Sequence, residues 1–190
     1  VLNSMENSSR KSVERLQSTG IRVELTSFRT TADMIDSIRK IGNLTGEPKK
    51  AEALASNMIS KLTSIKKRWI SAEKKKILIV WGRNPIVVAG TNSYMNEHMD
   101  TIGATNAMAS SKSPSPKIGL EELISMDPDV IIDLSMGSEK NDESGKIWSG
   151  VHALRAVREK KVYSMNTGDV RRGPRLADGL EKLAKMIHSE

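Results

Sequence analysis

The chain has 190 residues, which is enough for one domain or for two small ones. Its 30 lysines and arginines outnumber its 23 aspartates and glutamates, yet no basic run is interleaved with aromatic residues, so the net charge of +7 gives little support to a nucleic-acid surface. No apolar run approaches the roughly 18 residues of a membrane span, and the lack of cysteine excludes a disulfide framework and a thiolate metal site.

The chain opens with the pattern of a parallel α/β unit. Residues 1–4 are typical of the end of a buried strand, and residues 8–19 have helical spacing before Gly20, which suits a helix C-cap. Residues 21–25 alternate as a strand does. Because the first residue is Val1 and not Met, we expect a piece of a longer protein whose targeting segment lies outside this sequence.

Two helices are predicted next. Thr30 and Asp33 form a capping box in which Asp replaces the usual Glu, and Gly42 and Gly46 punctuate the end of that helix. Residues 47–73 then carry apolar side chains every three or four positions. These side chains are Ala51, Leu54, Ala55, Met58, Leu62, Ile65 and Trp69. At about 1.5 Å per residue this helix would span roughly 40 Å, which favours a connection between two packed units over an ordinary surface helix.

The remaining sequence alternates strands with helices. The predicted strands are residues 76–81, 129–135 and 161–165. The first of them is continuously apolar, as expected when both faces of a sheet are covered. The predicted helices are residues 94–102, 119–126, 151–157 and the segment that begins at Pro174. Residues 83–93 and 111–119 are predicted as loops, the second of them rich in serine and proline.

Five stretches of the sequence follow one another in a specific order. They are IGNLTGEPKKAEAL, VVAGTNSYMNEHMDTIGATNAM, PKIGLEELISMDPDVIIDLS, REKKVYSMN and GPRLADGLEKLAKMIH. In the third stretch a short acidic helix ends in Asp-Pro-Asp and leads into a buried strand. In this succession the chain resembles the extracytoplasmic binding proteins of ABC importers for cobalamin, haem and ferric siderophores.

The resemblance implies an α/β fold of two Rossmann-like lobes with parallel sheets, joined by one long helix, the first lobe being truncated. Residues 1–45 would be the remainder of the N-terminal lobe, residues 46–73 the linking helix, and residues 74–190 the C-terminal lobe. Most of the first lobe, with half of the ligand wall and any lipid-anchor cysteine, would lie outside this chain.

The resemblance also implies a function without catalysis or cofactor. Such a protein, a monomer, captures an iron-siderophore, haem or cobalamin-type ligand between its lobes and delivers it to a membrane permease. It works outside the cytoplasm, in the periplasm or lipid-anchored at the outer face of the cell membrane. Family members dock on the permease through acidic surface residues. Glu139 and Glu143 are candidates for this role, without positional support.

Ligands of open α/β sheets bind outside the carboxyl ends of the strands, so the residues that follow the strands of the C-terminal lobe are predicted to meet at one edge. The candidate ligand-binding residues are Trp81, Arg83, Asn84, Gly90, Thr91, Tyr94, Arg171 and Arg172. The arginines would bind carboxylates, phosphates or a catecholate complex, or else form a solvated rim.

The other candidates also have two interpretations each. Trp81 would stack on a flat apolar ligand face or fill the core, with equal support for both. Tyr94 would bond a ligand or ferric iron, although packing is the commoner role of a tyrosine at a helix start. Gly90 permits close backbone approach or forms a simple turn.

Other classes of protein are less well supported. His98, His152 and His188 lie on separate predicted elements without a short-spaced pair, which argues against a bare transition-metal site. We therefore expect any metal to arrive inside a chelate. No dinucleotide, Walker or nucleophile-elbow motif is present. Three alternatives stay open: a binding protein for a small oxyanion on the same fold, a chelatase-like enzyme on a split α/β scaffold, and a nucleic-acid-binding domain.

Overall fold

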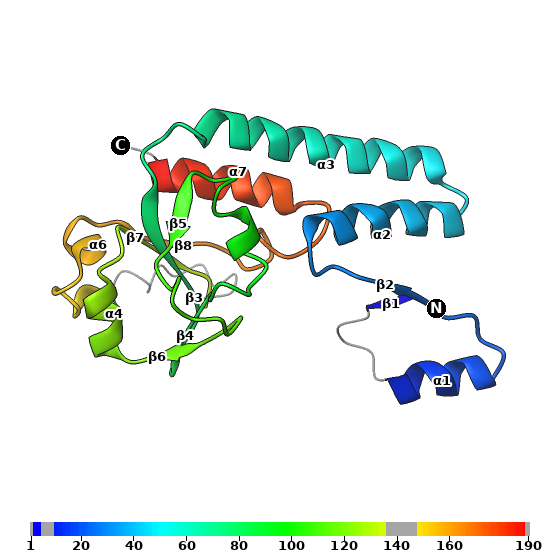
Figure 1. Cartoon of the computed structure of the whole chain (residues 1–190), viewed down its shortest axis with the longest axis horizontal. Coiled ribbons are helices and arrows are strands. Elements are labelled where there is room, and N and C mark those ends of the chain that lie inside the picture. Colours follow the sequence, from blue (N-terminus) through cyan, green and yellow to red (C-terminus); the bar gives the residue numbers. More distant parts are fainter. Residues whose placement is uncertain (1, 5–9, 136–147, 189–190) are drawn as a thin grey trace. The chain divides into compact units, whose positions relative to one another are not determined.

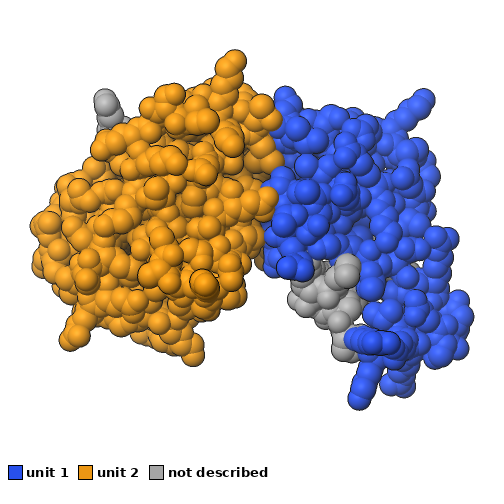
Figure 2. Space-filling view, in the orientation of Figure 1, with its two compact units in different colours: residues 1–60, 172–174 blue, residues 61–171, 175–190 orange. Residues whose placement is uncertain are grey.

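The computed structural model describes residues 2–4, 10–135 and 148–188. The chain divides into two units, residues 1–60 with 172–174 and residues 61–171 with 175–190, which Figure 2 shows in two colours. No helix among the described residues is both long enough and apolar enough to cross a membrane.

The first unit begins with the predicted strand, helix and strand. β1 (Leu2–Ser4) pairs in parallel with β2 (Glu24–Thr26), and α1 (Arg10–Ser18) connects them. This confirms the parallel unit, although β2 starts later than the strand predicted over residues 21–25. Ile21 is 40 % exposed in the connection before β2, whereas Thr26 is buried at the end of β2. The alternating residues of the sequence therefore start a few positions before the residues that pair with β1.

Helix α2 (Thr31–Leu44) begins with the predicted capping box. The Asp33 backbone N–H donates to Thr30 Oγ1, and the Thr30 N–H donates to Asp33 Oδ2, both at 3.1 Å. The Ser27 hydroxyl also donates to Asp33 Oδ2 at 2.9 Å. These donors, that of Ser27 above all, hold the pKa of the Asp33 carboxyl below its ordinary value.

Helix α3 (Pro48–Trp69) confirms the long predicted helix, and its 22 residues correspond to about 33 Å (Figure 1). Four of the predicted apolar positions are buried: Ala51, Ala55, Met58 and Ile65. Leu54 is 40 % exposed and lies outside that face. A Cβ atom added at Gly42 of α2 would lie 2.1 Å from the Cβ of Ala51, so the glycine lets the two helices approach each other.

The second unit is built on a mixed sheet with the strand order β6-β4-β3-β7-β8. Its strands are β3 (Lys75–Arg83), β4 (Ile86–Val88), β5 (Ala104–Asn106), β6 (Lys117–Ile118), β7 (Val130–Asp133) and β8 (Val162–Ser164). The predicted strands correspond to β3, β7 and β8, which are parallel. β5 also runs parallel to β3, whereas β4 and β6 are antiparallel and lie where loops were predicted.

The core of this unit explains the apolar run in β3. Ile77, Leu78, Ile79 and Val80 all have 0 % exposure, so both faces of the strand are covered. Leu78 and Val80 pack in one apolar cluster with Leu123 of α4 (Leu120–Met126) and Ala156 of α6 (Arg155–Arg158). Helix α7 (Leu176–His188) buries Leu176, Leu180, Leu183, Ala184 and Ile187, as its periodicity predicts.

Two predicted helices of the second unit are wrong in extent. Residues 94–102 contain only the 3-10 turn η1 (Asn96–His98). The buried Met95, Met99 and Ile102 have helix-like spacing, but hydrogen bonds such as His98 N–H to Met95 O belong to tight turns. The helix predicted over residues 151–157 begins only at Arg155, where the carboxylate of Asp127 accepts the Arg155 backbone N–H at 2.9 Å.

Candidate functional site

A buried carboxylate joins the carboxyl ends of β3 and β7. Asp133, the last residue of β7, has 0 % exposure. Its Oδ2 atom accepts hydrogen bonds from Arg83 Nε and from the indole Nε1 of Trp148, each at 2.7 Å. Its Oδ1 atom accepts from the backbone N–H and the hydroxyl of Ser135, at 3.0 and 2.6 Å. Every oxygen of this carboxylate is therefore satisfied inside the protein.

The Asp133 carboxylate offsets the charge of Arg83, one of the predicted ligand-binding residues. The Arg83 side chain is only 11 % exposed and is ion-paired with Asp133. Its Nη2 atom is buried without a described partner. Sequence reasoning did not select Asp133, although the signal was available, because the residue is a carboxylate placed at the carboxyl end of a buried apolar strand.

An aromatic pair lies at the same edge of the sheet. The rings of Trp81, near the end of β3, and Tyr94 have centroids 5.8 Å apart and planes inclined at 36°. Both side chains are half-buried. The Tyr94 hydroxyl donates to the carbonyl of Val170 at 2.9 Å, which ties the pair to the segment that precedes Arg171. Trp81 is thus neither a core plug nor a free surface residue.

Gly90 and Thr91 contact another part of the chain. A Cβ atom at Gly90 would lie 1.9 Å from the backbone oxygen of Ser113. The Thr91 hydroxyl donates to the backbone oxygen of Ser111 at 2.7 Å. The group that approaches Gly90 is therefore the serine- and proline-rich segment of the chain itself, and contact of Gly90 with a ligand stays a prediction.

The remaining predicted residues are dispersed. Asn84 is exposed in the turn between β3 and β4, next to Arg83, and Arg171 is exposed after Val170. Arg172 belongs to the first unit, where its Nη1 donates to the backbone oxygen of Phe28 at 3.2 Å. Glu139 and Glu143 lie outside the described residues. The structure thus brings Trp81, Arg83 and Tyr94 to one edge, with Asn84 and Arg171 as chain neighbours of that edge.

The histidines have separate environments. His98 is 3 % exposed, its Nε2 atom has no described partner, and burial lowers its pKa from the ordinary value against an opposing effect of Glu97. His188 stacks on Trp69 with ring centroids 4.4 Å apart, and His152 is exposed. The described residues contain no group of three or more histidine, cysteine or carboxylate side chains that could hold a metal ion.

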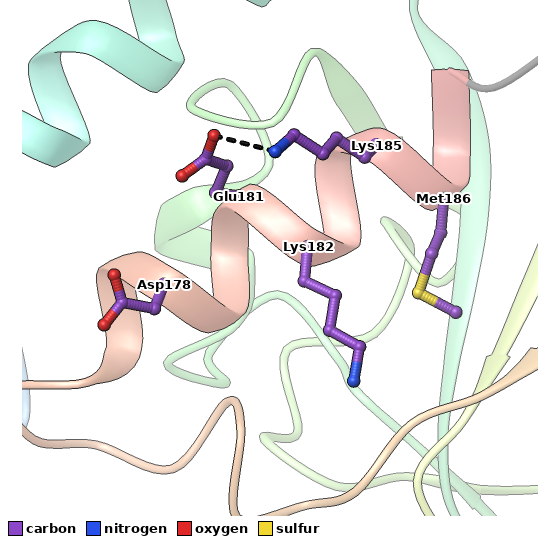
Figure 3. A pocket seen from close by; sticks show the side chains of 5 residues that line it. All are labelled: Asp178, Glu181, Lys182, Lys185 and Met186. Atoms are coloured by element: carbon purple, nitrogen blue, oxygen red, sulfur yellow. Dashed lines mark ion pairs between the residues drawn. The ribbon is translucent and has the colours of Figure 1, made fainter.

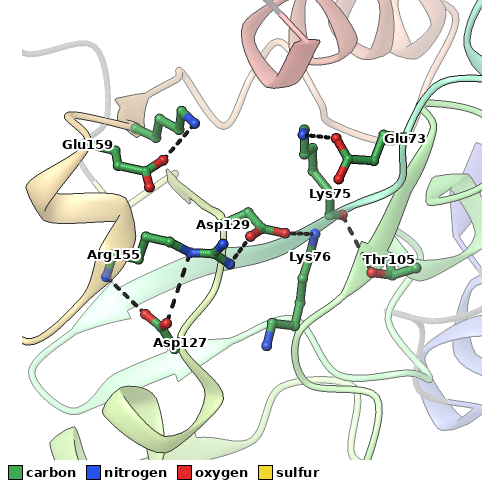
Figure 4. A network of polar contacts seen from close by, with 9 residues as sticks. Glu73, Lys75, Lys76, Thr105, Asp127, Asp129, Arg155 and Glu159 are labelled. Atoms are coloured by element: carbon green, nitrogen blue, oxygen red, sulfur yellow. Dashed lines mark hydrogen bonds and ion pairs between the residues drawn. The ribbon is translucent and has the colours of Figure 1, made fainter.

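The Asp-Pro-Asp motif lies at the opposite, amino end of the strands (Figure 4). Asp127 ends α4 in a left-handed conformation with φ of 38° and accepts the Arg155 N–H. The Asp129 carboxylate accepts the backbone N–H of Lys76 at 2.7 Å and pairs with the Arg155 guanidinium. The motif therefore fastens α4, β3 and α6 together, which is a structural role.

An open cavity of about 460 Å³ runs along the outside of α7 (Figure 3). It is lined by Asp178, Glu181, Lys182, Lys185 and Met186. Its charged groups are paired within the chain, for example Lys185 with Glu181 at 3.0 Å and Lys182 with Asp169 at 2.9 Å. None of the predicted ligand-binding residues lines this cavity, and its compensated charges favour no ligand class.

The sequence matches a known protein family. The family model described as periplasmic binding protein matches residues 4–167, which is most of the chain. The chain belongs to the periplasmic binding protein family. This confirms the resemblance and the α/β fold that it implied, with the addition of the antiparallel strands β4 and β6.

One curated relative is an uncharacterized ABC transporter substrate-binding lipoprotein, YvrC, of Bacillus subtilis. It is 31 % identical over 190 residues, which cover 97 % of this chain and 59 % of the relative. The chain thus spans about three fifths of the length of that relative.

Two solved structures share the fold. The vitamin B12-binding protein BtuF of Vibrio cholerae has a TM-score of 0.83 and 19 % identity, over 98 % of this chain and 72 % of that protein. A periplasmic heme-binding protein of Pseudomonas aeruginosa has a TM-score of 0.82 and 24 % identity, over 98 % and 71 %.

Proposed function

We propose that this chain is part of the extracytoplasmic substrate-binding protein of an ABC importer. It captures an iron-siderophore, haem or cobalamin-type ligand and delivers it to a membrane permease, in the periplasm or from a lipid anchor at the outer face of the membrane. The names of the relatives support the ligand class and the transport role. Binding requires no catalytic step, and the protein acts as a monomer without a nucleic-acid partner.

The observation that carries the proposal is the Trp81–Tyr94 pair at the carboxyl edge of the sheet. Two half-buried rings at this edge, inclined to each other, offer aromatic surface against which the macrocycle of a haem or a corrin can pack. Arg171 adds a guanidinium for which no side-chain partner is found among the described residues. Asn84 and Arg172 remain candidates for further ligand contacts.

A small oxyanion is a poorer match to this edge. Such a ligand needs several convergent cations or N–H donors. The charge of Arg83 is already offset by the buried Asp133 carboxylate at 2.7 Å. The edge of the second unit therefore favours a large, flat and mainly apolar ligand over a compact anion.

The test is an isothermal titration of the full-length protein with cobalamin, haemin and a set of ferric siderophores. We expect one of them to bind at micromolar concentration or tighter. Trp81→Ala should weaken that binding about tenfold, because the stacking surface is removed.

Trp69→Phe is the matched control, since Trp69 stacks on His188 instead. Its affinity should equal that of the wild type. Failure of every ligand to bind would refute the importer assignment, whereas equal affinity of the Trp81 and Trp69 variants would refute the assigned edge alone.

A further inference from the structure

A cavity of about 430 Å³ lies beside α6 in the second unit. None of the residues assigned above to ligand capture lines it. Its apolar wall is formed by Trp148, Val157 and Val162, the first residue of β8. Trp148 is only 4 % exposed, and its indole N–H is bonded to Asp133, so the ring is held in place. The volume falls within the range of about 300 to 1,000 Å³ that is usual for small-molecule sites.

The described residues on the polar side of this cavity carry one sign of charge. Its described lining contributes Ser149, His152, Arg158 and Lys160, and it contains no carboxylate. Positively charged side chains beside low-dielectric walls raise the local concentration of anions. This cavity therefore differs from the open cavity along α7, where acidic and basic side chains form ion pairs with each other.

The ion pairing of the neighbouring cations follows the same division. Arg155 and Lys161 do not line the cavity, and both have acidic partners. Arg155 pairs with Asp129 (Figure 4), and Lys161 pairs with Glu159 at 2.7 Å. Arg158 and Lys160 line it, and neither forms an ion pair with a described residue. Within this short segment, the cations that face the cavity are the ones without a counter-ion among the described residues.

Arg158 is also fixed in position before any ligand arrives. Its Nη1 atom donates to the backbone oxygens of His152 and Ala153, at 3.0 and 2.7 Å. These bonds orient the guanidinium, and no described carboxylate offsets its positive charge. A preorganised cation loses little side-chain freedom when an anion binds, so it contributes more to affinity than a mobile one does.

We propose that this cavity binds a small organic anion with an apolar or aromatic body, such as an aromatic carboxylate or sulfonate. The body packs against Trp148, Val157 and Val162, and the acid group meets Arg158 and Lys160. The site is independent of the ligand captured at the edge with Trp81 and Tyr94, so either assignment can fail without the other.

The test uses 8-anilinonaphthalene-1-sulfonate, an aromatic sulfonate whose emission rises when it enters an apolar site, with the full-length protein. The cavity variant carries Arg158→Gln and Lys160→Gly. Lys160 has a φ of +57°, a conformation that glycine adopts without strain, so this change removes a cation and does not oppose the fold. We expect the dissociation constant of the probe to rise at least about tenfold.

The matched control carries Lys66→Gln and Lys67→Gln, which remove the same charge from exposed positions of α3 outside the cavity. It should bind the probe as the wild type does, and so should Trp81→Ala. Thermal unfolding establishes that each variant is folded. Equal probe affinity in the cavity variant and the wild type, loss of binding in Trp81→Ala, or no saturable binding to the wild type would each overturn the proposal.

Discussion

The carboxylate of Asp133 accepts hydrogen bonds from Arg83, Ser135 and Trp148 although no part of the residue reaches solvent. Burying a charge in this way is tolerated only when it is paired and fully hydrogen-bonded. The pair connects two neighbouring strands at the edge where the aromatic side chains lie. Its main effect is to fix the end of β3, and with it the backbone that carries Trp81.

Asp133→Asn should destabilise the protein by roughly 3–5 kcal/mol, because the amide keeps the shape but leaves the buried Arg83 without a counter-charge. The measurement is the free energy of unfolding in urea. The exposed pair between Lys74 and Asp100, at 2.7 Å, supplies the control, since Asp100→Asn should lose no more than about 1 kcal/mol. Equal losses in the two variants would show that the buried pair is not a structural link.

For single residues, the sequence predicts where a side chain lies better than it predicts which groups that side chain contacts. The order of elements predicts that Trp81, Arg83 and Tyr94 lie near the carboxyl edge of the sheet, and they do lie at one edge. The pairing of Arg83 with Asp133 joins residues 50 positions apart, and no local pattern reports such a contact. The hydrogen bond from Tyr94 to Val170 spans 76 positions and likewise cannot be predicted from a local sequence pattern.

Helix α7 shows how one residue limits the packing of an element. Gly179 lies inside the helix, where glycine is normally unfavourable by about 1 kcal/mol relative to alanine. A Cβ atom there would lie 1.9 Å from the backbone oxygen of Asp169. The glycine therefore permits the segment before Val170 to pass close to the helix, and Val170 in turn accepts the Tyr94 hydroxyl.

Gly179→Ala should lower the free energy of unfolding by roughly 1–3 kcal/mol, because backbone atoms must move to relieve the contact. Urea denaturation followed by circular dichroism measures the change. Gly150→Ala is the control, since an added Cβ meets nothing within 4 Å at that position. A Gly179 variant as stable as the wild type would mean that the segment at Asp169 yields without loss.

The long elements with a periodic or continuous apolar face are predicted correctly. The faces of α3 and α7 each extend over several turns, and the run in β3 is buried on both sides. β4 and β6 have three and two residues, too few to show a period, and they were assigned to loops. In residues 94–102 the spacing of buried methionines imitated a helix whose backbone hydrogen bonds are those of turns.

For the whole molecule, stability is expected to differ between the two units. The first holds a two-stranded sheet, and α1 has no buried residue. The second holds a six-stranded sheet whose central strand is fully buried over four consecutive residues, from Ile77 to Val80. Two-stranded sheets are marginally stable by themselves, so local opening should be concentrated in the first unit.

Hydrogen exchange followed by mass spectrometry tests this expectation. Amides of α1 and β2 should exchange at least about a hundredfold faster than those of β3 and β7 at neutral pH. The two helices α2 and α7, one from each unit, serve as internal references. Comparable protection of β2 and β3 would show that the two units unfold as one cooperative body.

The Asp127–Asp129–Arg155 network has a consequence for altering this molecule. It links α4, β3 and α6 at the amino ends of the strands, whereas the aromatic pair lies at their carboxyl ends. No residue belongs to both groups, so the side chains at the carboxyl ends can be replaced while every contact of the network is kept.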